Sequence, residues 1–366
     1  MKAHVIGYLC TSKSWGGLEM NQLKNAKWMK KRGHNVLLFA QENSPIWSAA
    51  ISENIDVIHV NQHRKYYDFI KAIQLKKKIK KQGVTHLIVR DPKDMSLAGL
   101  TKSLLKNKLF LAYFMEMQLG IPKRDFLHTI RFKKFDLWSC PLPWLAEQVK
   151  ELTNFPKERI HIVPSGLEID EFKDLLSKEK ARKLLDLPEK LTLFGLIGRF
   201  DKQKGQKLLL DAYLKLPNAP VGLVFLGEKT KGEATDYYTD LIKIIEENKL
   251  QNKVFIHPFR KDISPFYAAI DCLVMASKSE TFGMVTIEAM ACGVPVIGSN
   301  AGGTTEILEN GKLGLLFTPE DEKDLSEKLK LFLKSENSSS EQLKKAVRKY
   351  DFTFVCKKIE QLLGLN

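Results

Sequence analysis

The strongest chemical signal in the sequence is a pair of glutamates, Glu280 and Glu288, separated by seven residues. Glu280 follows the apolar run Cys272–Ala276, and Glu288 lies among apolar residues in the helical pattern Met284–Ala291. A buried carboxylate needs hydrogen-bond donors, and two adjacent hydroxyl groups are suitable ones. Gly283 stands where the helix should begin, so backbone N–H groups there can face a ligand. Each glutamate alone is more simply an exposed helix residue, but together they favour a binding site.

A second candidate site is the basic loop from Gly198 to Gly205, which lies between an apolar run and a helical pattern. Arg199 can hold a phosphate through two hydrogen bonds, Lys204 adds a point charge, and Gly205 opens the start of the helix. The simpler alternative is a solvated basic loop. At a ligand site, these residues would form a clamp for a diphosphate.

A third candidate is the pair Gly16 and Gly17, which follows the first apolar run and leads into a helical pattern. Adjacent glycines let a ligand approach the backbone, and a helix N-terminus attracts anions. A plain turn is the alternative interpretation. The stretch is not a Gly-x-Gly-x-x-Gly motif, which counts against an NAD enzyme.

These loops should be positioned by parallel sheets, because short apolar runs alternate with longer helical patterns throughout the chain. Strands are expected at Ala3–Leu9, Asn35–Ala40, Asp56–Val60, His86–Val89, Leu109–Phe114, Ile160–Val163, Leu191–Ile197, Val221–Leu226, Val254–His257, Cys272–Ala276, Val294–Gly298 and Gly314–Phe317. Helices are expected at Leu18–Lys31, Tyr67–Lys81, Met95–Lys106, Gly205–Lys215, Tyr237–Asn248, Met284–Ala291 and Glu341–Leu363. The fold class is therefore α/β, and 366 residues suit two doubly wound, Rossmann-like domains. Ligands bind such sheets at the carboxyl ends of the strands, where all three candidate loops lie.

The block around the two glutamates resembles the retaining glycosyltransferases of family four. The matching residues are Glu280 and Glu288, Ala289 to Val296, Gly302-Gly303 and Glu306, together with Gly16-Gly17, Pro164-Ser165-Gly166, Gly198-Arg199 and Lys204-Gly205. This resemblance covers nearly the whole chain. It implies the GT-B fold, in which two Rossmann-like domains face a central cleft. The expected domains are residues 1–165 on the acceptor side, residues 166–345 on the donor side, and a C-terminal helix, residues 346–366, packed back on the first domain.

The resemblance also implies an activity. A sugar would pass from a nucleotide-diphosphate sugar, with UDP or GDP, to an acceptor hydroxyl with retention of configuration and without a metal or other cofactor. Arg199 and Lys204 would hold the diphosphate and stabilise its developing charge, Glu288 would accept hydrogen bonds from the ribose, and Glu280 would contact the sugar. The remaining donor-site residues would be Gly16, Gly17, Gly198, Phe259, Arg260, Thr281, Phe282, Gly283 and Met284.

The sequence departs from this family at one position near the acceptor. Many relatives carry a histidine after a first-domain strand, whereas this chain has Glu116 in the comparable segment. Glu116 is therefore a candidate for the catalytic role, and Gln118 is the neighbouring candidate. Arg90 and Asp91 follow another predicted strand and could contact the acceptor, although an ordinary ion pair within the loop explains them equally well.

The charge of the chain is unevenly distributed. The chain has 58 Lys and Arg against 43 Asp and Glu, a net charge of +15. Residues 1–165 hold 28 basic and 13 acidic residues, whereas the remainder holds 30 of each. With 44% hydrophobic and 28% charged residues, a disordered or collagen-like chain is excluded. The basic excess therefore belongs to the first half of the chain.

Two stretches, Arg64–Lys81 and Lys123–Lys134, mix basic residues with aromatic and aliphatic ones. This composition suits an anionic membrane surface, and an exposed helix with lysines for solubility is an equal alternative. Nucleic acid is the least favoured partner, because no recognisable binding module accompanies the charge. The five cysteines are odd in number and widely spread, which indicates reduced thiols. We expect a cytoplasmic protein, with peripheral binding to the inner face of the cytoplasmic membrane if the basic stretches bind lipid.

The leading hypothesis is a glycosyltransferase of cell-envelope polysaccharide, lipopolysaccharide or glycolipid synthesis. A nucleotide-sugar epimerase or a phosphorylase on the same scaffold is the enzymatic alternative. A phosphorylase would need a lysine that carries pyridoxal phosphate, and the sequence has no evident site for one. The non-enzymatic alternative is a basic protein that binds membrane or nucleic acid.

Overall fold

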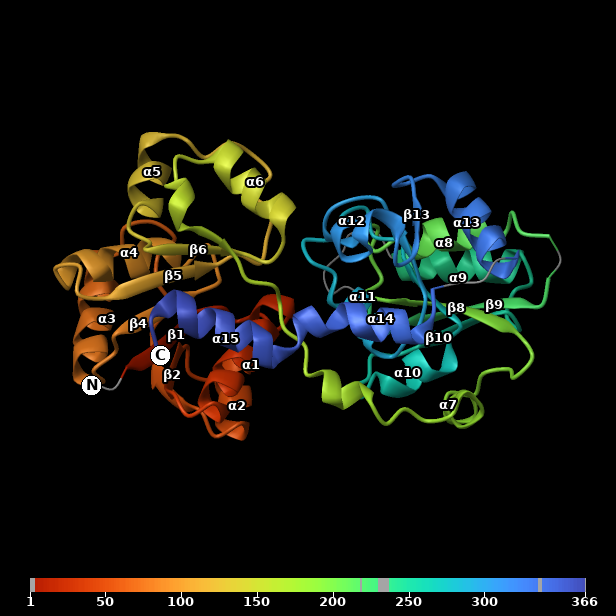
Figure 1. Cartoon of the computed structure of the whole chain (residues 1–366), viewed down its shortest axis with the longest axis horizontal. Helices are drawn as coiled ribbons and strands as arrows, with labels where there is room; N and C mark the ends of the chain where they lie inside the picture. Colours follow the sequence, from red (N-terminus) through yellow and green to blue (C-terminus); the bar gives the residue numbers. More distant parts are fainter. Residues whose placement is uncertain (1–3, 218, 230–236, 335–337, 366) are drawn as a thin grey trace. The chain divides into compact units, whose positions relative to one another are not determined.

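The chain folds into two compact units. The computed structural model describes residues 4–217, 219–229, 237–334 and 338–365. Unit 1 comprises Met1–Gly166 and Phe352–Asn366, and unit 2 comprises Leu167–Asp351. Each unit is a parallel sheet with helices on both faces (Figure 1).

Unit 1 contains a seven-stranded sheet in the order β3-β2-β1-β4-β5-β6-β7. Its strands are β1 Val5–Cys10, β2 Asn35–Ala40, β3 Asp56–His59, β4 His86–Val89, β5 Phe110–Phe114, β6 Leu137–Cys140 and β7 Ile160–Ile162. Because β2 and β4 lie on opposite sides of β1, the strand order reverses between β1 and β4. Such a reversal is the place where open α/β sheets bind ligands.

Helices cover both faces of this sheet because its strands are buried on both sides. In β1, Tyr8 belongs to a core cluster with Trp28 and Val355, whereas the adjacent Leu9 belongs to a second cluster with Leu75. The helices are α1 Gly17–Lys31, α2 Pro45–Ser52, α3 Phe69–Lys81, α4 Met95–Leu104, α5 Phe126–Phe132, α6 Pro143–Leu152 and α15 Phe352–Leu363.

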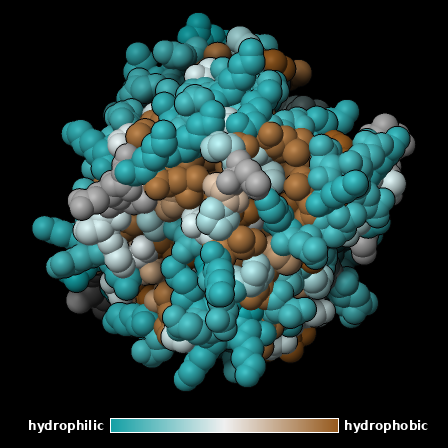
Figure 2. Space-filling model, turned by 90° about the vertical axis from the view of Figure 1, so that its right-hand side faces the viewer, coloured by the Kyte–Doolittle hydropathy of each residue, from teal (hydrophilic) through white to brown (hydrophobic). Residues whose placement is uncertain are grey.

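Unit 2 contains a six-stranded sheet in the order β10-β9-β8-β11-β12-β13, which reverses between β8 and β11. Its strands are β8 Thr192–Ile197, β9 Val221–Leu226, β10 Val254–His257, β11 Cys272–Met275, β12 Val296–Ser299 and β13 Leu315–Phe317. Its helices are α7 Lys178–Leu184, α8 Gln206–Tyr213, α9 Tyr237–Glu247, α10 Ser264–Ala269, α11 Met284–Ala291, α12 Gly303–Ile307, α13 Glu322–Lys334 and α14 Ser340–Val347. Figure 2 shows one face of this unit, where hydrophilic side chains cover most of the surface around separate apolar areas.

The structure confirms the two parallel sheets, and the predicted strands that are described agree with the observed ones to within about two residues. The predicted start at Ala3 lies outside the described residues. Sequence reasoning missed β6, a four-residue strand that contains a serine and is too short to stand out. It was also wrong in predicting one helix over Glu341–Leu363, since a 3₁₀ turn at Arg348–Tyr350 separates α14 from α15.

Helix α15 packs on α1 and completes one face of unit 1 (Figure 1). Its Glu360 receives hydrogen bonds from Arg32 Nε at 2.7 Å and Arg32 Nη2 at 2.6 Å, and its Oε1 lies 2.7 Å from His34 Nε2. The hydrogen bond from Arg32 lowers the pKa of Glu360, so the stabilisation is present at neutral pH and is lost as the pH falls below the ordinary carboxyl range. None of the described helices is long and apolar enough to span a membrane.

Replacing Glu360 with alanine should destabilise unit 1, because the partly exposed Arg32 and His34 would lose their anionic partner, whose side chain is only 9% exposed. We expect the free energy of unfolding to fall by about 1–3 kcal/mol, as for hydrogen bonds to charged groups. The control is Glu53→Ala, which removes the exposed pair of Glu53 with Lys27 and should cost less than about 1 kcal/mol. Denaturant unfolding of both variants measures the free energy of unfolding. Equal decreases in the two variants would contradict a larger stabilising contribution from Glu360.

Candidate functional site

The two predicted loops of unit 2 meet where its strand order reverses. Lys204 follows β8 and Glu280 follows β11, and Lys204 Nζ lies 2.7 Å from Glu280 Oε1. The two side chains are 29% and 18% exposed, so a ligand can reach the pair. The structure therefore brings together a cation and a carboxylate at the edge where α/β sheets bind ligands.

Glycines let the backbones of these loops come into direct contact. A Cβ atom on Gly205 would lie 2.2 Å from the carbonyl oxygen of Ala276, and one on Gly302 would lie 2.3 Å from the carbonyl oxygen of Glu280. The Gly303 N–H donates to that same Glu280 oxygen at 2.8 Å. Gly283, with φ of 96°, occupies the left-handed region before α11. The backbone that carries Glu280 is thus fixed from two sides.

The Gly198–Gly205 loop is held by its own polar groups. The Asp201 carboxylate accepts the backbone N–H groups of Gln203 at 2.9 Å and Lys204 at 3.2 Å. The Arg199 side chain is 68% exposed and lies 3.7 Å from Asp201, while the Gly198 carbonyl faces the Gln206 side chain. Arg199 is therefore available to an anionic ligand without breaking a buried contact.

Glu288 has a protein partner, which the sequence did not reveal. It is 8% exposed on α11, and the Tyr267 hydroxyl donates to its Oε2 at 2.8 Å. Burial, together with the charge of Glu288, raises the pKa of Tyr267 well above its ordinary value, so the phenol stays protonated and keeps donating. A carboxylate has several acceptor positions, so this contact leaves the ribose hypothesis open.

The other predicted donor-site residues of unit 2 lie beside Gly283 in the chain or on the loop after β10. Phe282 is buried against Tyr350 at a ring separation of 5.5 Å, and Thr281 and Met284 beside it are partly exposed. On the loop after β10, Phe259 is 52% exposed and Arg260 Nε donates to the Asp262 carbonyl at 3.0 Å.

Thr286 and His257 are among the described side chains of unit 2 that have a buried polar atom without a hydrogen-bond partner. Thr286 Oγ1 is buried without a hydrogen-bond partner and lies 3.4 Å from the position of a Cβ at Gly283. His257 Nε2 at the end of β10 is also buried and unpaired, and burial lowers the pKa of this imidazole. Sequence reasoning missed Thr286, although its position one helical turn after Gly283 was a usable signal.

The glycine pair of unit 1 begins α1. Gly16 is the N-cap residue, and its N–H donates to Glu19 Oε2 at 2.9 Å. A Cβ on Gly17 would meet no atom within 4 Å, and Gly17 is not among the residues with positive φ. Neither strain nor packing within unit 1 requires glycine at position 17, which leaves room for a ligand there.

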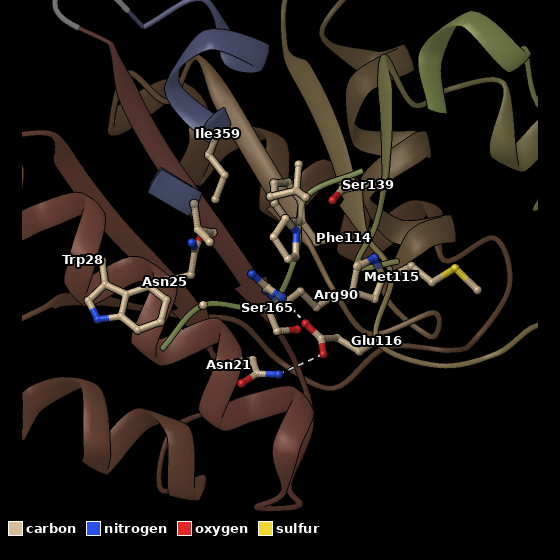
Figure 3. A pocket seen from close by; sticks show the side chains of 15 residues that line it. Asn21, Asn25, Trp28, Arg90, Phe114, Met115, Glu116, Ser139, Ser165 and Ile359 are labelled. Atoms are coloured by element: carbon tan, nitrogen blue, oxygen red, sulfur yellow. Dashed lines mark hydrogen bonds and ion pairs between the residues drawn. The ribbon is translucent and has the colours of Figure 1, made fainter. Parts of the chain in front are cut away.

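Glu116 is tied into a buried ion pair at the end of β5. Arg90 Nη1 contacts its Oε1, and Asn21 Nδ2 donates to its Oε2 at 3.0 Å (Figure 3). The side chains of Arg90 and Glu116 are only 8% and 10% exposed, and together with Asn21 they line the pocket of Figure 3. Burial raises the pKa of Glu116 while the Arg90 charge opposes this, and the catalytic role of Glu116 stays a prediction.

The alternative interpretation of Arg90 and Asp91 as an ion pair within the loop is wrong, because Arg90 pairs with Glu116. Asp91 is 9% exposed and its Oδ1 accepts the Lys93 N–H at 2.8 Å. Gln118 lies partly exposed on the loop after β5. Arg90 and Asp91 are 6% and 9% exposed, and their contact with the acceptor stays a prediction.

Sequence reasoning missed a polar cluster at the strand reversal of unit 1. Asp94, which is fully buried, accepts the Thr11 N–H at 3.0 Å and lies 2.7 Å from His63 Nε2. His63 Nδ1 lies 2.7 Å from the Arg64 carbonyl oxygen, which can only accept. Both ring nitrogens therefore face acceptors, which favours the doubly protonated imidazolium. His63 lies in an irregular loop, so no periodic pattern could have linked it to Asp94.

The His63–Asp94 pair should make stability depend on pH. Burial alone would lower the pKa of His63, but the hydrogen bond and charge of Asp94 outweigh it and raise the pKa above its ordinary value. A raised histidine pKa gives stability that is complete below pH of about 6.5 and lost as the pH rises through the folded-state pKa. The stability difference between the wild type and His63→Gln should therefore be larger at low pH than at high pH.

Denaturant unfolding across this pH range measures the effect, and His161→Gln is the matched control. Burial lowers the pKa of His161, so its contribution has the opposite sign and increases as the pH rises. An unchanged pH dependence in His63→Gln would show that the imidazolium pair does not form.

Two family models match consecutive parts of the chain. The model described as Glycosyltransferase Family 4 matches residues 15–171, and the model described as Glycosyl transferases group 1 matches residues 177–350. The chain is 34% identical over 178 residues to a D-inositol 3-phosphate glycosyltransferase of Mycobacterium sp. (strain KMS), and 31% identical over 183 residues to one of Xylanimonas cellulosilytica. These matches span 48% of this chain but only 40% and 43% of the relatives' own lengths.

Solved structures resemble the chain over its full length. A glycosyltransferase from Rickettsia africae matches with a TM-score of 0.88 and 19% identity, covering 100% of this chain and 99% of the other. HepE from Anabaena, crystallised with UDP and glucose, matches with a TM-score of 0.83 and 22% identity, covering 98% and 99%. The two Rossmann-like units are thus those of the GT-B fold. With both family models matched along its length, the chain belongs to the family 4 glycosyltransferases.

Proposed function

We propose that this protein transfers a sugar from a nucleotide-diphosphate sugar to an acceptor hydroxyl with retention of configuration. The observation that carries the proposal is the Lys204–Glu280 pair across the strand reversal of unit 2. A diphosphate needs cations and a sugar needs hydrogen-bond acceptors, and this pair supplies one of each at a single place.

Cleavage of the donor builds negative charge on the departing diphosphate. In this proposal, exposed Arg199 and the Lys204 ammonium hold the phosphates and stabilise that charge, with help from the N-terminus of α11 after Gly283. A bound diphosphate would share Lys204 with Glu280, and Glu280 would then accept hydrogen bonds from the sugar hydroxyls. These groups belong to the chain, so the charge stabilisation that they provide requires no metal.

The nucleoside would occupy the adjoining surface of unit 2. Glu288 would accept the ribose hydroxyls while Tyr267 fixes the carboxylate, and buried Thr286 Oγ1 offers an additional polar group beside Gly283. The exposed ring of Phe259 and the guanidinium of Arg260 would border the base. In unit 1 taken by itself, the open space at Gly17 leaves room for an anionic ligand.

Glu116 would act as a positioning residue and not as a base. Its carboxylate accepts from both Arg90 and Asn21, which ties the end of β5 to α1 and β4. Without a protein base, the departing phosphate itself can take the proton of the acceptor hydroxyl. Retention would follow if attack and departure occur on the same face of the sugar.

We propose a UDP-sugar as the first donor to test and an envelope saccharide or glycolipid as the acceptor. Crystals of Anabaena HepE hold UDP and glucose, and the curated relatives act on inositol 3-phosphate. Another structural neighbour is a lipopolysaccharide outer core galactosyltransferase with a TM-score of 0.77. An acceptor of this class would place the enzyme at the inner face of the cytoplasmic membrane.

Replacing Glu288 with glutamine should weaken nucleotide binding about 10- to 100-fold, because the ribose loses a charged acceptor. The amide oxygen can still accept from Tyr267, so the fold should be retained. The exposed Glu246→Gln of α9 is the control and should bind as the wild type does. Thermal shifts with a panel of UDP- and GDP-sugars give the affinities. Equal binding by both variants would remove the main support for a donor site in unit 2.

Replacing Lys204 with methionine should slow sugar transfer more than it weakens binding of the free nucleoside. Lys204 would stabilise charge that develops only as the bond breaks, so turnover should fall by about 10²-fold or more. Lys215→Met, which removes an exposed lysine 3.9 Å from Glu322, is the control. Turnover assays test this, and the anomeric configuration of the product by NMR tests retention. An inverted product would refute the stereochemical part of the proposal.

A further inference from the structure

Exposed apolar side chains of the described chain concentrate in two short stretches of unit 1. Of the nineteen large hydrophobic residues that are exposed, five lie between residues 66 and 73 and five between residues 117 and 130. The first group is Tyr66, Tyr67, Phe69, Ile70 and Ile73, and the second is Met117, Ile121, Phe126, Leu127 and Ile130. A concentration of this kind marks an interaction surface.

Two stretches that overlap these groups hold most of the excess positive charge. Arg64–Lys81 and Lys123–Lys134 together contain thirteen Lys and Arg against two Asp, a net charge of +11 out of the chain's +15. Both aspartates are used as helix caps, since Asp68 accepts the Lys71 N–H at 3.1 Å and Asp125 accepts the His128 N–H at 3.1 Å. Acidic side chains within these stretches therefore do little to balance the cations.

Helix α3 uses only one side for packing. Ala72, Leu75 and Ile79 are buried in the core of unit 1. Phe69, Ile70 and Ile73 are 59%, 70% and 45% exposed, and the exposed lysines Lys77 and Lys80 follow them along the helix. The exposed surface thus changes from apolar to basic along the helix.

Helix α5 continues this surface. Its Arg131 and Phe132 are buried, whereas Phe126, Leu127 and Ile130 are 76%, 59% and 37% exposed. Helices α3, α4 and α5 follow one another along one side of unit 1 (Figure 1).

The two stretches border on one another. The Arg131 guanidinium lies over the Tyr66 ring at 5.6 Å. Burial lowers the pKa of Lys123 most, and the positive charges of Arg131 and Lys65 lower it further. Lys123 and Arg131 of the second stretch therefore lie close to Lys65 of the first. We name the exposed residues of 64–81 and 121–134 the basic apolar face.

We propose that the basic apolar face docks unit 1 on an anionic lipid bilayer. Lysines and arginines would attract the negative headgroups while the aromatic and aliphatic side chains enter the boundary with the acyl chains. Ile70, Ile73, Leu127 and Ile130 argue against nucleic acid, because aliphatic side chains cannot stack on bases as aromatic rings do. A helix with lysines for solubility alone has no need to expose Phe126. Docking does not depend on sugar transfer, although an enzyme with a lipid-linked acceptor would benefit from it.

The test is cosedimentation of the full chain with vesicles of phosphatidylglycerol and phosphatidylcholine, compared with phosphatidylcholine alone. Binding should require the anionic lipid and weaken as salt is raised. The double variant Lys77→Gln/Lys80→Gln should bind roughly thirty-fold more weakly, since each lysine near an anionic surface contributes about fivefold. The control is Lys357→Gln/Lys358→Gln, which removes two exposed lysines of α15 in the same unit and should bind as the wild type does.

Apolar insertion is tested separately with Ile70→Ser/Phe126→Ser. These exposed changes should leave the melting temperature unchanged and weaken vesicle binding, whereas Phe354→Ser, at a position 62% exposed on α15, should not. Nucleotide-sugar thermal shifts should persist in all variants, so failure of docking is distinct from failure of the donor site. Absence of binding to anionic vesicles at low salt would overturn the proposal. So would equal losses in the α15 controls, or binding of single-stranded nucleic acid in place of lipid.

Discussion

The close approach of three loop backbones at the sheet edge of unit 2 is the constraint on which its candidate site depends. Gly205 and Gly302 are the points of contact, where any Cβ atom would collide with the carbonyl oxygens of Ala276 and Glu280. This packing holds Glu280 beside Lys204 at 2.7 Å. A cation and a carboxylate that are fixed by backbone contacts need little rearrangement to receive a polar ligand, which is the condition for strong electrostatic stabilisation.

Unit 1 has the same type of sheet but fills the corresponding edge differently. Asp94 joins Thr11 to His63 across the strand reversal, and Arg90 joins Glu116 at the next strand. These charges are almost fully buried and paired with one another, so they fix the loops and leave little free charge at this edge. At Gly17, neither packing nor strain within unit 1 explains the residue type.

The two units differ in net charge, and the proposed partner of each unit explains the difference. Unit 2 arises from the nearly neutral half of the sequence, where a few placed cations suffice for a diphosphate. The basic excess of unit 1 lies mostly on the exposed parts of α3, α5 and their preceding loops, together with unpacked apolar side chains. In unit 2, single cations would hold the phosphates of one ligand. In unit 1, a broad positive surface would attract an anionic partner as a whole.

The sequence by itself determined the two parallel sheets and most strand positions, because alternating apolar runs encode them. It also indicated the family and the loops that carry Lys204, Glu280 and Glu288, through the resemblance of these motifs to a known family. Tertiary structure alone decided the partners of these residues. Tyr267 reaches Glu288 from α10, Asn21 reaches Glu116 from α1, and His63 reaches Asp94 from an irregular loop. Such pairs join residues far apart in the chain, and their geometry depends on how sheets and helices pack, which no local pattern records.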